Sequence, residues 1–289
     1  IEEECKALLK DAGVAFDDRP TITPEELLAD IGNYDGLIVR GRTKVTREVI
    51  EAHDRLKIVG RAGVGVDNID LAAAQSKGVT VVNSPTATTD AVAEHTLALL
   101  LGLVRHIPRA DATMKAGQWA KKALNGSELG GKTLGIVGFG RIGQGVGQRA
   151  AAFGMRIIAH DPLINAEMIQ AAGAEAMGLE ALYQQANVIS LHMPLTPDTK
   201  NMFNGEAFAK MKRGVLLVCA ARGGIIDETA LLSSLESGQV AGAALDVFTE
   251  EPPGLTALVA HPNVVATPHI GAQTAEAQVR AAQHIAEEI

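Results

Sequence analysis

The sequence contains few cysteines and few aromatic residues. Only two cysteines, Cys5 and Cys219, occur among 289 residues, and aromatic residues make up 3% of the chain. Two thiols cannot build the network of disulfides that stabilises small secreted domains, so we expect a protein of the reducing cytoplasm. Hydrophobic residues amount to 47%, which is enough to build full cores. Because so few of them are aromatic, we expect Ala, Val, Leu and Ile to fill these cores.

The chain also lacks an excess of positive charge and a long hydrophobic run. Its formal net charge is −8, which argues against nucleic acid or an anionic membrane as a partner. The most apolar stretch, "AVAEHTLALLLGLVRHI", includes Glu94 and His95 and is too short and too polar to span a bilayer. The chain starts at Ile1 in helix-like sequence and stops within another helical pattern, so we expect it to be part of a longer protein.

Short β-branched segments alternate with helical patterns from one end to the other. "GLIVR" (36–40), "KIVG" (57–60) and "VTVVN" (79–83) are typical of buried strands, and residues 133–267 contain about six more. Such alternation predicts parallel sheets covered by helices on both faces. Since there are too many strands for one sheet, we predict an α/β protein with two doubly wound parallel-sheet domains.

Two phosphate-binding signatures overlap in "GSELGGKTLGIVGFGRIG" (126–143). Residues 126–133 match the P-loop string, which works only when a strand precedes it and a helix follows it. Here "WAKKALN" comes before and the strand-like "TLGIV" comes after. The order is therefore wrong for a nucleotide-cleaving P-loop.

The second signature, G-x-G-x-x-G at residues 138–143, has the right surroundings, with a strand before it and a helix after it. Gly138 allows the tight turn, Gly140 lets the backbone approach a pyrophosphate, and Gly143 permits close helix–strand packing. Asp161 ends the next strand and would accept bonds from the ribose hydroxyls, which favours NAD over NADP. The predicted cofactor-binding residues of the turn are Gly138, Gly140, Arg141, Ile142 and Gly143.

Three later motifs stand at strand ends: "ARGGIID" (221–227), "LDVFTEEPP" (245–253) and "TPHIGAQT" (267–274). Open α/β sheets bind ligands beyond the carboxyl ends of their strands, so these motifs can converge on one crevice. Together with "LIVRGRTKVT" (37–46) and "GRAGVGVDNID" (60–70), they resemble the D-2-hydroxyacid dehydrogenase family over nearly the whole chain.

The resemblance implies a Rossmann NAD-binding domain at residues 85–270. This domain is inserted in a smaller, flavodoxin-like substrate-binding domain, formed by residues 1–84 and 271–289 and lacking its N-terminal strand. The helix that starts near Asp90 and the arm after it resemble family elements that pack between subunits, so a homodimer or homotetramer is expected.

The resemblance also implies a catalytic set, which Arg222, Glu251 and His269 match. A histidine suits proton exchange with the substrate hydroxyl because its ordinary pKa lies near the working pH. Glu251 would orient the ring, and Arg222 would hold the substrate carboxylate through its planar fork. Glu250 is a rival for Glu251, and the resemblance favours the acid directly before the prolines. Asp246 matches the family position at the nicotinamide end.

For the substrate, the resemblance assigns the backbone of Gly63, Val64 and Gly65 to the carboxylate and the side chains of Arg40 and Arg61 to a phosphate. It thus implies oxidation of 3-phosphoglycerate to 3-phosphohydroxypyruvate, the first step of serine biosynthesis. The two arginines could instead form structural ion pairs, which would suit a glyoxylate or hydroxypyruvate reductase. An NAD-sensing transcriptional corepressor is a further alternative. The remaining histidines show no ligand spacing, so no metal is expected.

Overall fold

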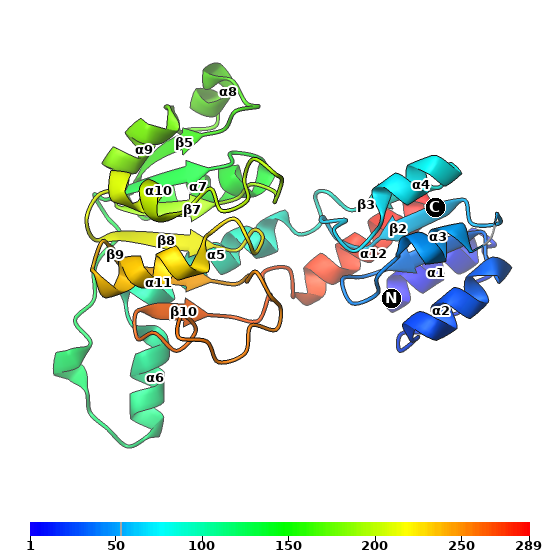
Figure 1. Cartoon of the computed structure of the whole chain (residues 1–289), viewed down its shortest axis with the longest axis horizontal. Helices are drawn as coiled ribbons and strands as arrows, with labels where there is room; N and C mark the ends of the chain where they lie inside the picture. The colour runs from blue at the N-terminus through cyan, green and yellow to red at the C-terminus, as the bar shows by residue number, and fades with distance from the viewer. Residues whose placement is uncertain (53) are drawn as a thin grey trace. The chain divides into compact units, whose positions relative to one another are not determined.

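The computed structural model describes residues 1–52 and 54–289, which form two compact units with a sheet each (Figure 1). Unit 1 comprises Ile1–Ala91 and Ala272–Ile289, and unit 2 comprises Val92–Gly271. The sequence-based boundaries at residues 84 and 270 differ from these because the start of the linking helix, at Thr89, still belongs to unit 1.

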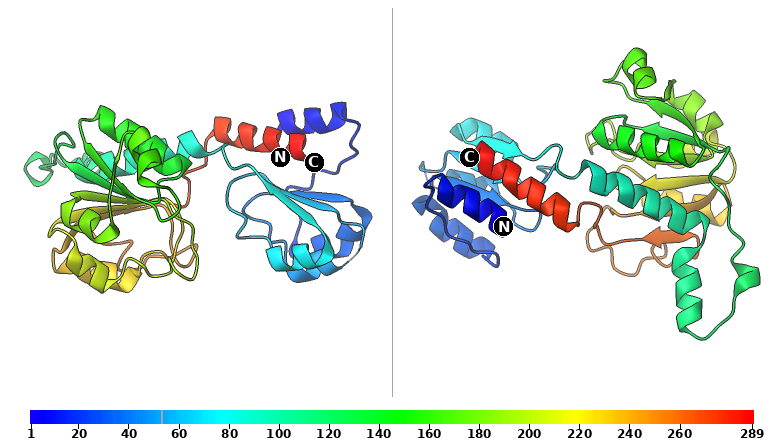
Figure 2. Two further views of the ribbon diagram at one scale, coloured as in Figure 1. Left: turned by 90° about the horizontal axis from the view of Figure 1, so that it is seen from above. Right: turned by 180° about the vertical axis from the view of Figure 1, so that it is seen from behind.

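Unit 1 contains a parallel sheet in the order β1-β2-β3, formed by Gly36–Val39, Ile58–Arg61 and Thr80–Asn83. Helices α1 (Glu3–Asp11) and α12 (Ala275–Glu288) pack together, and α12 contacts the sheet. Figure 2 shows these two helices side by side. Gly60 makes the packing possible, because a side chain there would lie 2.6 Å from Ile285.

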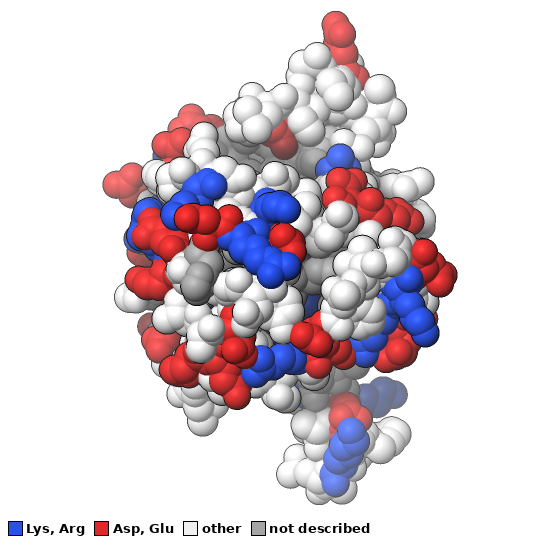
Figure 3. Space-filling model, turned by 90° about the vertical axis from the view of Figure 1, so that its right-hand side faces the viewer, with Lys and Arg blue, Asp and Glu red and all other residues white. Residues whose placement is uncertain are grey.

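A second hydrophobic core of unit 1 is formed by the helices α2 (Pro24–Asp30), α3 (Arg47–Glu51) and α4 (Leu71–Lys77). They pack with Val39 and Val59 of the sheet. The surface of this unit carries charges in opposite-sign pairs, such as Arg55 with Asp35 and Lys77 with Asp54. Acidic and basic side chains are interspersed on the face that Figure 3 shows.

Unit 2 contains a seven-stranded parallel sheet in the order β10-β9-β8-β7-β4-β5-β6. Its strands are β4 (Thr133–Val137), β5 (Arg156–His160), β6 (Glu175–Ala176), β7 (Val188–Leu191), β8 (Val215–Cys219), β9 (Val240–Leu245) and β10 (Val264–Ala266). The strand order reverses direction at β4, which creates the switch point where doubly wound sheets bind dinucleotides. The prediction of two parallel-sheet α/β units is confirmed.

Helices cover both faces of this sheet, which explains why its central strands β4 and β7 are buried along their whole length. On one face α5 (Thr89–Val104) and α7 (Arg141–Ala152) pack over residues such as Ile136. On the other face lie α9 (Leu179–Gln185), α10 (Gly205–Lys210) and α11 (Glu228–Glu236). The short helix α8 (Ala166–Ala171) precedes the edge strand β6.

An arm follows α5 and projects from the rest of unit 2 (Figure 1). It consists of α6 (Ile107–Lys115), a connecting loop and the short helix η2 (Lys121–Ala123). None of the α6 residues is buried, and Trp119 in the loop is 80% exposed. Within residues 1–52 and 54–289, each helix is too short or too polar for a membrane span.

Candidate active site

The glycine turn at residues 138–143 joins β4 to α7 at the switch point. Gly138 has a φ of 87°, and a Cβ there would lie 2.7 Å from the His192 backbone. A Cβ on Gly143 would lie 2.3 Å from the Gly138 carbonyl oxygen. Both positions therefore require glycine for the fold alone.

Gly140 differs from these two glycines, because a Cβ there would meet no atom within 4 Å. It is the N-cap of α7 and provides no side-chain cap, so the first amides of this helix are left for a ligand. Of the next residues, Arg141 is exposed and Ile142 packs against the core. The open side of the turn thus fits a pyrophosphate that must approach the backbone closely.

Asp161 directly follows β5 and lies beside this turn. The strand register pairs Val137 with His160, which brings the two strand ends together. Asp161 accepts hydrogen bonds from the amides of Phe139 (2.7 Å) and Leu163 (2.8 Å). These bonds fix a carboxylate at the position where adenosine ribose hydroxyls bind in such folds, and its charge would repel a 2′-phosphate.

The structure brings Glu251 and His269 into contact although they are eighteen positions apart. His269 Nδ1 lies 2.7 Å from Glu251 Oε2, and the other carboxylate oxygen accepts from the amide of Phe248 at 3.1 Å. The His269 side chain is half-exposed. With Nδ1 occupied by the carboxylate, Nε2 is left to exchange a proton with a substrate.

Arg222 follows β8, and its loop lies against the loop that carries Glu251. A Cβ on Gly223 would lie 1.8 Å from the Phe248 carbonyl oxygen, so the two backbones touch. Glu228 strengthens this contact by accepting a hydrogen bond from the amide of Thr249 at 2.6 Å. The guanidinium of Arg222 donates to the Ala221 carbonyl.

Asp246 ends β9 and is almost completely buried, with 1% of its side chain exposed. Burial by itself raises its pKa, but hydrogen bonds from His95, Thr267 and the amides of Ile270 and Gly271 outweigh this effect, so the pKa lies below its ordinary value. The carboxylate is therefore ionised. Sequence reasoning did not single out His95 or Thr267, since neither belongs to a recognisable spacing.

The predicted substrate residues all lie in unit 1. Arg40 follows β1 and donates to the carboxylate of Glu2, a partner that nothing in the sequence spacing indicates. Arg61 ends β2, and its guanidinium lies over Gly63, where a Cβ would overlap it. Gly63 has a φ of 147° and is followed by the half-buried Val64 and Gly65. The structure thus joins Arg61 to the 63–65 loop and joins Arg40 to Glu2.

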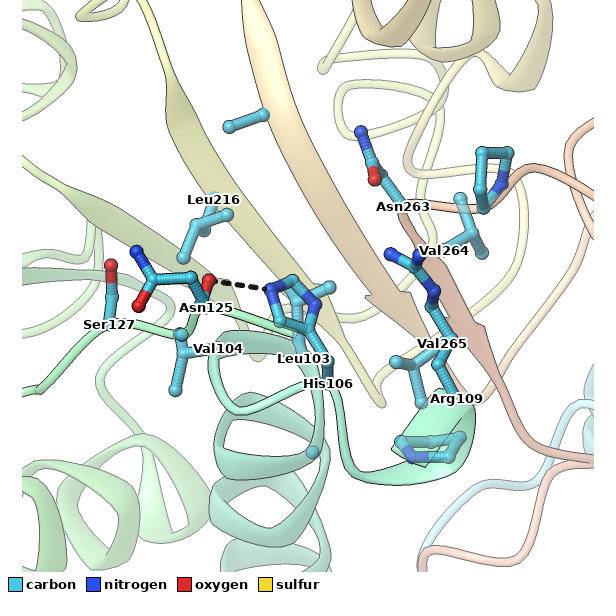
Figure 4. Close-up of a pocket in the computed structure, with 15 residues that line it drawn as sticks. Leu103, Val104, His106, Arg109, Asn125, Ser127, Leu216, Asn263, Val264 and Val265 are labelled. Atoms are coloured by element: carbon cyan, nitrogen blue, oxygen red, sulfur yellow. Dashed lines mark hydrogen bonds between the residues drawn. The ribbon is translucent and has the colours of Figure 1, made fainter. Parts of the chain in front are cut away.

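A separate hollow of about 200 Å³ lies at the amino ends of β8, β9 and β10, beside the start of the arm. His106 Nε2 lies 3.2 Å from the Asn125 carbonyl oxygen there. Figure 4 shows Asn125 and Ser127 on one side and Arg109 and Asn263 on the other. None of the predicted site residues lines this hollow. Within residues 1–52 and 54–289, no group of three or more His, Cys, Asp or Glu side chains could hold a metal ion.

The doubly wound sheet, its open glycine turn and the carboxylate after β5 define a dinucleotide-binding protein. The paired side chains of Glu251 and His269 follow strands β9 and β10 of the same sheet. Residues 97–271 match the family model described as "D-isomer specific 2-hydroxyacid dehydrogenase, NAD binding domain". The chain belongs to the D-isomer specific 2-hydroxyacid dehydrogenase family, and NAD is its cofactor. The family resemblance seen in the sequence is confirmed.

Similar proteins include two D-3-phosphoglycerate dehydrogenases. The chain is 49% identical to that of Rattus norvegicus, over 98% of this chain and 53% of the relative, and 51% identical to that of Bacillus subtilis (strain 168), over 90% and 50%. A crystal structure of a glyoxylate reductase from Paecilomyes thermophila matches with a TM-score of 0.89 and 34% identity, covering 99% of this chain and 89% of that one. The chain spans about half the length of the curated relatives it matches.

Proposed function

We propose that this chain carries the catalytic part of a D-3-phosphoglycerate dehydrogenase, which oxidises 3-phosphoglycerate to 3-phosphohydroxypyruvate and opens serine biosynthesis. The observation that carries the proposal is the 2.7 Å contact between Glu251 and His269. It supplies the acid/base group that oxidation of a 2-hydroxy acid requires. The identity of about half of the residues to D-3-phosphoglycerate dehydrogenases supports the choice of substrate.

In this proposal each residue has a defined task. The Gly138–Gly143 turn and Asp161 hold NAD, and bound NAD supplies a hydride acceptor. His269 takes the hydroxyl proton of the substrate on Nε2, while Glu251 stabilises the imidazolium that results. Arg222 binds the substrate carboxylate through two parallel hydrogen bonds and polarises the C2 oxygen. In the reverse reaction His269 returns the proton.

The phosphate is proposed to bind Arg61 and Arg40, which follow neighbouring strands of unit 1. The bond between Arg40 and Glu2 means that phosphate must compete with a carboxylate for Arg40. A phosphate carries more charge than a carboxylate and can win this competition. Gly63, Val64 and Gly65 would offer amides to the substrate carboxylate.

The bond between Arg40 and Glu2 favours a second candidate function. If Glu2 keeps Arg40, the substrate is unphosphorylated, and the chain would be a glyoxylate or hydroxypyruvate reductase. The structural similarity to a glyoxylate reductase suits this alternative.

Oxidation of NADH by phosphohydroxypyruvate, hydroxypyruvate and glyoxylate separates the two candidates. We expect the highest kcat/KM with phosphohydroxypyruvate and a selective loss for this compound in Arg40→Ala, by about tenfold or more, the loss of one charge-assisted bond. Arg42→Ala is the matched control, because Arg42 donates to the backbone of Pro20 instead. An equal loss for all three compounds in Arg40→Ala would remove phosphate recognition from the proposal.

We also propose that the protein is a cytoplasmic homodimer held by the arm. Ile107, Met114 and Trp119 are exposed on the arm to 57%, 56% and 80%, and such apolar side chains are stabilised by a partner surface. Both cysteines are free, as expected in a reducing compartment. Sedimentation of the wild type and of Met114→Glu tests the dimer, which should dissociate in the variant; a monomeric wild type contradicts it.

A further inference from the structure

The carboxylate of Asp246 is surrounded by hydrogen-bond donors of its own chain. Oδ1 accepts from the Thr267 hydroxyl (2.6 Å) and from the amide of Ile270 (2.9 Å), and Oδ2 accepts from the amide of Gly271 (2.8 Å). His95 Nε2 lies 3.2 Å from Oδ1. An ionised carboxylate has about four acceptor positions. Of the four donors, three lie at Oδ1 and one lies at Oδ2, and only 1% of the side chain is exposed.

The donors stand on both sides of His269 in the sequence. Thr267 lies two residues before it, and Ile270 and Gly271 follow it. The strand register explains this arrangement, because Leu245 of β9 pairs with Ala266 of β10, which places the next residues, Asp246 and Thr267, side by side. One carboxylate therefore anchors the turn that carries the acid/base histidine.

This turn needs an anchor. His269 has a φ of 52°, a left-handed conformation that is unfavourable for a residue with a side chain and persists only when the surroundings hold it. Side-chain packing does not provide the support, because Ile270 is 39% exposed and His269 is half-exposed. The hydrogen bonds to Asp246 support the left-handed conformation instead.

We propose that Asp246, together with Thr267 and His95, is the positioning group of His269: it holds the backbone of the 267–271 turn, while Glu251 holds the imidazole ring. The inference rests on the proposed function, in which His269 exchanges the substrate proton. Family resemblance suggests a contact of Asp246 with the nicotinamide. The bonds from Thr267, Ile270 and Gly271, which stand on both sides of His269 in the chain, favour action through the turn.

The test uses a matched pair of variants at Thr267. Thr267→Val removes the hydroxyl and keeps the shape, whereas Thr267→Ser keeps the hydroxyl. Asp246→Asn is the third variant. If it does not fold, the two Thr267 variants alone decide whether Asp246 positions the 267–271 turn. Three quantities are measured: the Kd of NADH by fluorescence, kcat at saturating NADH, and the ring resonances of His269 in ¹⁵N-histidine NMR spectra, assigned with His269→Gln.

We expect Thr267→Val to shift the His269 resonances and to lower kcat by about tenfold, with the Kd of NADH changed by less than about twofold. Thr267→Ser should keep the His269 resonances and kcat close to those of the wild type. Unchanged His269 resonances in Thr267→Val would overturn the proposal. So would a tenfold rise in the Kd of NADH in Asp246→Asn with kcat intact at saturation, because that result identifies a direct cofactor contact.

The NMR and NADH measurements need no substrate, so this inference and the proposed function fail separately. A wild-type chain that reduces none of the three oxo acids would contradict the proposed function. The response of the His269 resonances would still decide whether Asp246 positions the turn.

Discussion

His269 Nδ1 and Glu251 Oε2 lie 2.7 Å apart, and the second oxygen of Glu251 is held by the amide of Phe248. The carboxylate thus orients the ring and is itself oriented by its own loop. In Glu251→Gln the amide cannot compensate the charge of an imidazolium, so we expect kcat to fall by about 100-fold. Steady-state kinetics at saturating NADH checks this. Glu250→Gln is the control, and a larger loss in that variant would exchange the roles of the two acids.

Gly140 offers a test of where the cofactor binds. A Cβ there meets no protein atom, so Gly140→Ala should keep the stability of the wild type. It should raise the Kd of NADH by about tenfold or more, because the methyl group would occupy the space that we propose for the pyrophosphate. A fluorescence titration measures this. Unchanged affinity would place the cofactor elsewhere.

Gly223 offers the opposite case, in which the glycine serves the fold. In Gly223→Ala the methyl group would collide with the Phe248 carbonyl oxygen and separate the loops of Arg222 and Glu251. We expect a loss of stability of about 1–3 kcal/mol together with a loss of activity. Gly205→Ala, at the start of α10 with open space around its Cβ, is the control and should keep the melting temperature. If both variants melt alike, the loop contact is unimportant.

His192 predicts how stability depends on pH. Burial lowers its pKa from 6.5 to about 4, and its Nε2 lies 2.8 Å from the Ser190 hydroxyl. Between these values the unfolded chain binds the proton and the folded chain does not, so stability falls as the pH falls from about 6.5 to about 4. His192→Gln should reduce this fall relative to the wild type, as measured by urea unfolding at pH 7.5 and pH 5. Parallel losses in both proteins would contradict the prediction.

Local patterns were sufficient to predict much of this fold from the sequence. The strand before Gly138 and the helix after it distinguish a dinucleotide turn from the overlapping P-loop string, because both signals lie within a few residues of the motif. The edge strand β6, with only Glu175 and Ala176, was not predicted, since two residues carry no periodic pattern.

The candidate site could be predicted only in part. Strand-end positions indicate that Glu251 and His269 lie at one sheet edge, because neighbouring parallel strands end there. The pairing of Arg40 with Glu2 and the burial of Asp246 could not be predicted, because they depend on which side chains meet across separate elements. Such contacts follow from the packed geometry, which hydrophobic periodicity alone does not specify.

Gly271 is the last residue of unit 2, and a Cβ on it would lie 3.7 Å from Val92, the first residue of the same unit. The insertion therefore leaves and returns to its host sequence at nearly one point. Loop-closure entropy depends on how closely the ends must meet, and here folding of unit 2 has already brought them together. Once unit 2 is folded, the long insertion costs unit 1 little more entropy than a short turn between Ala91 and Ala272.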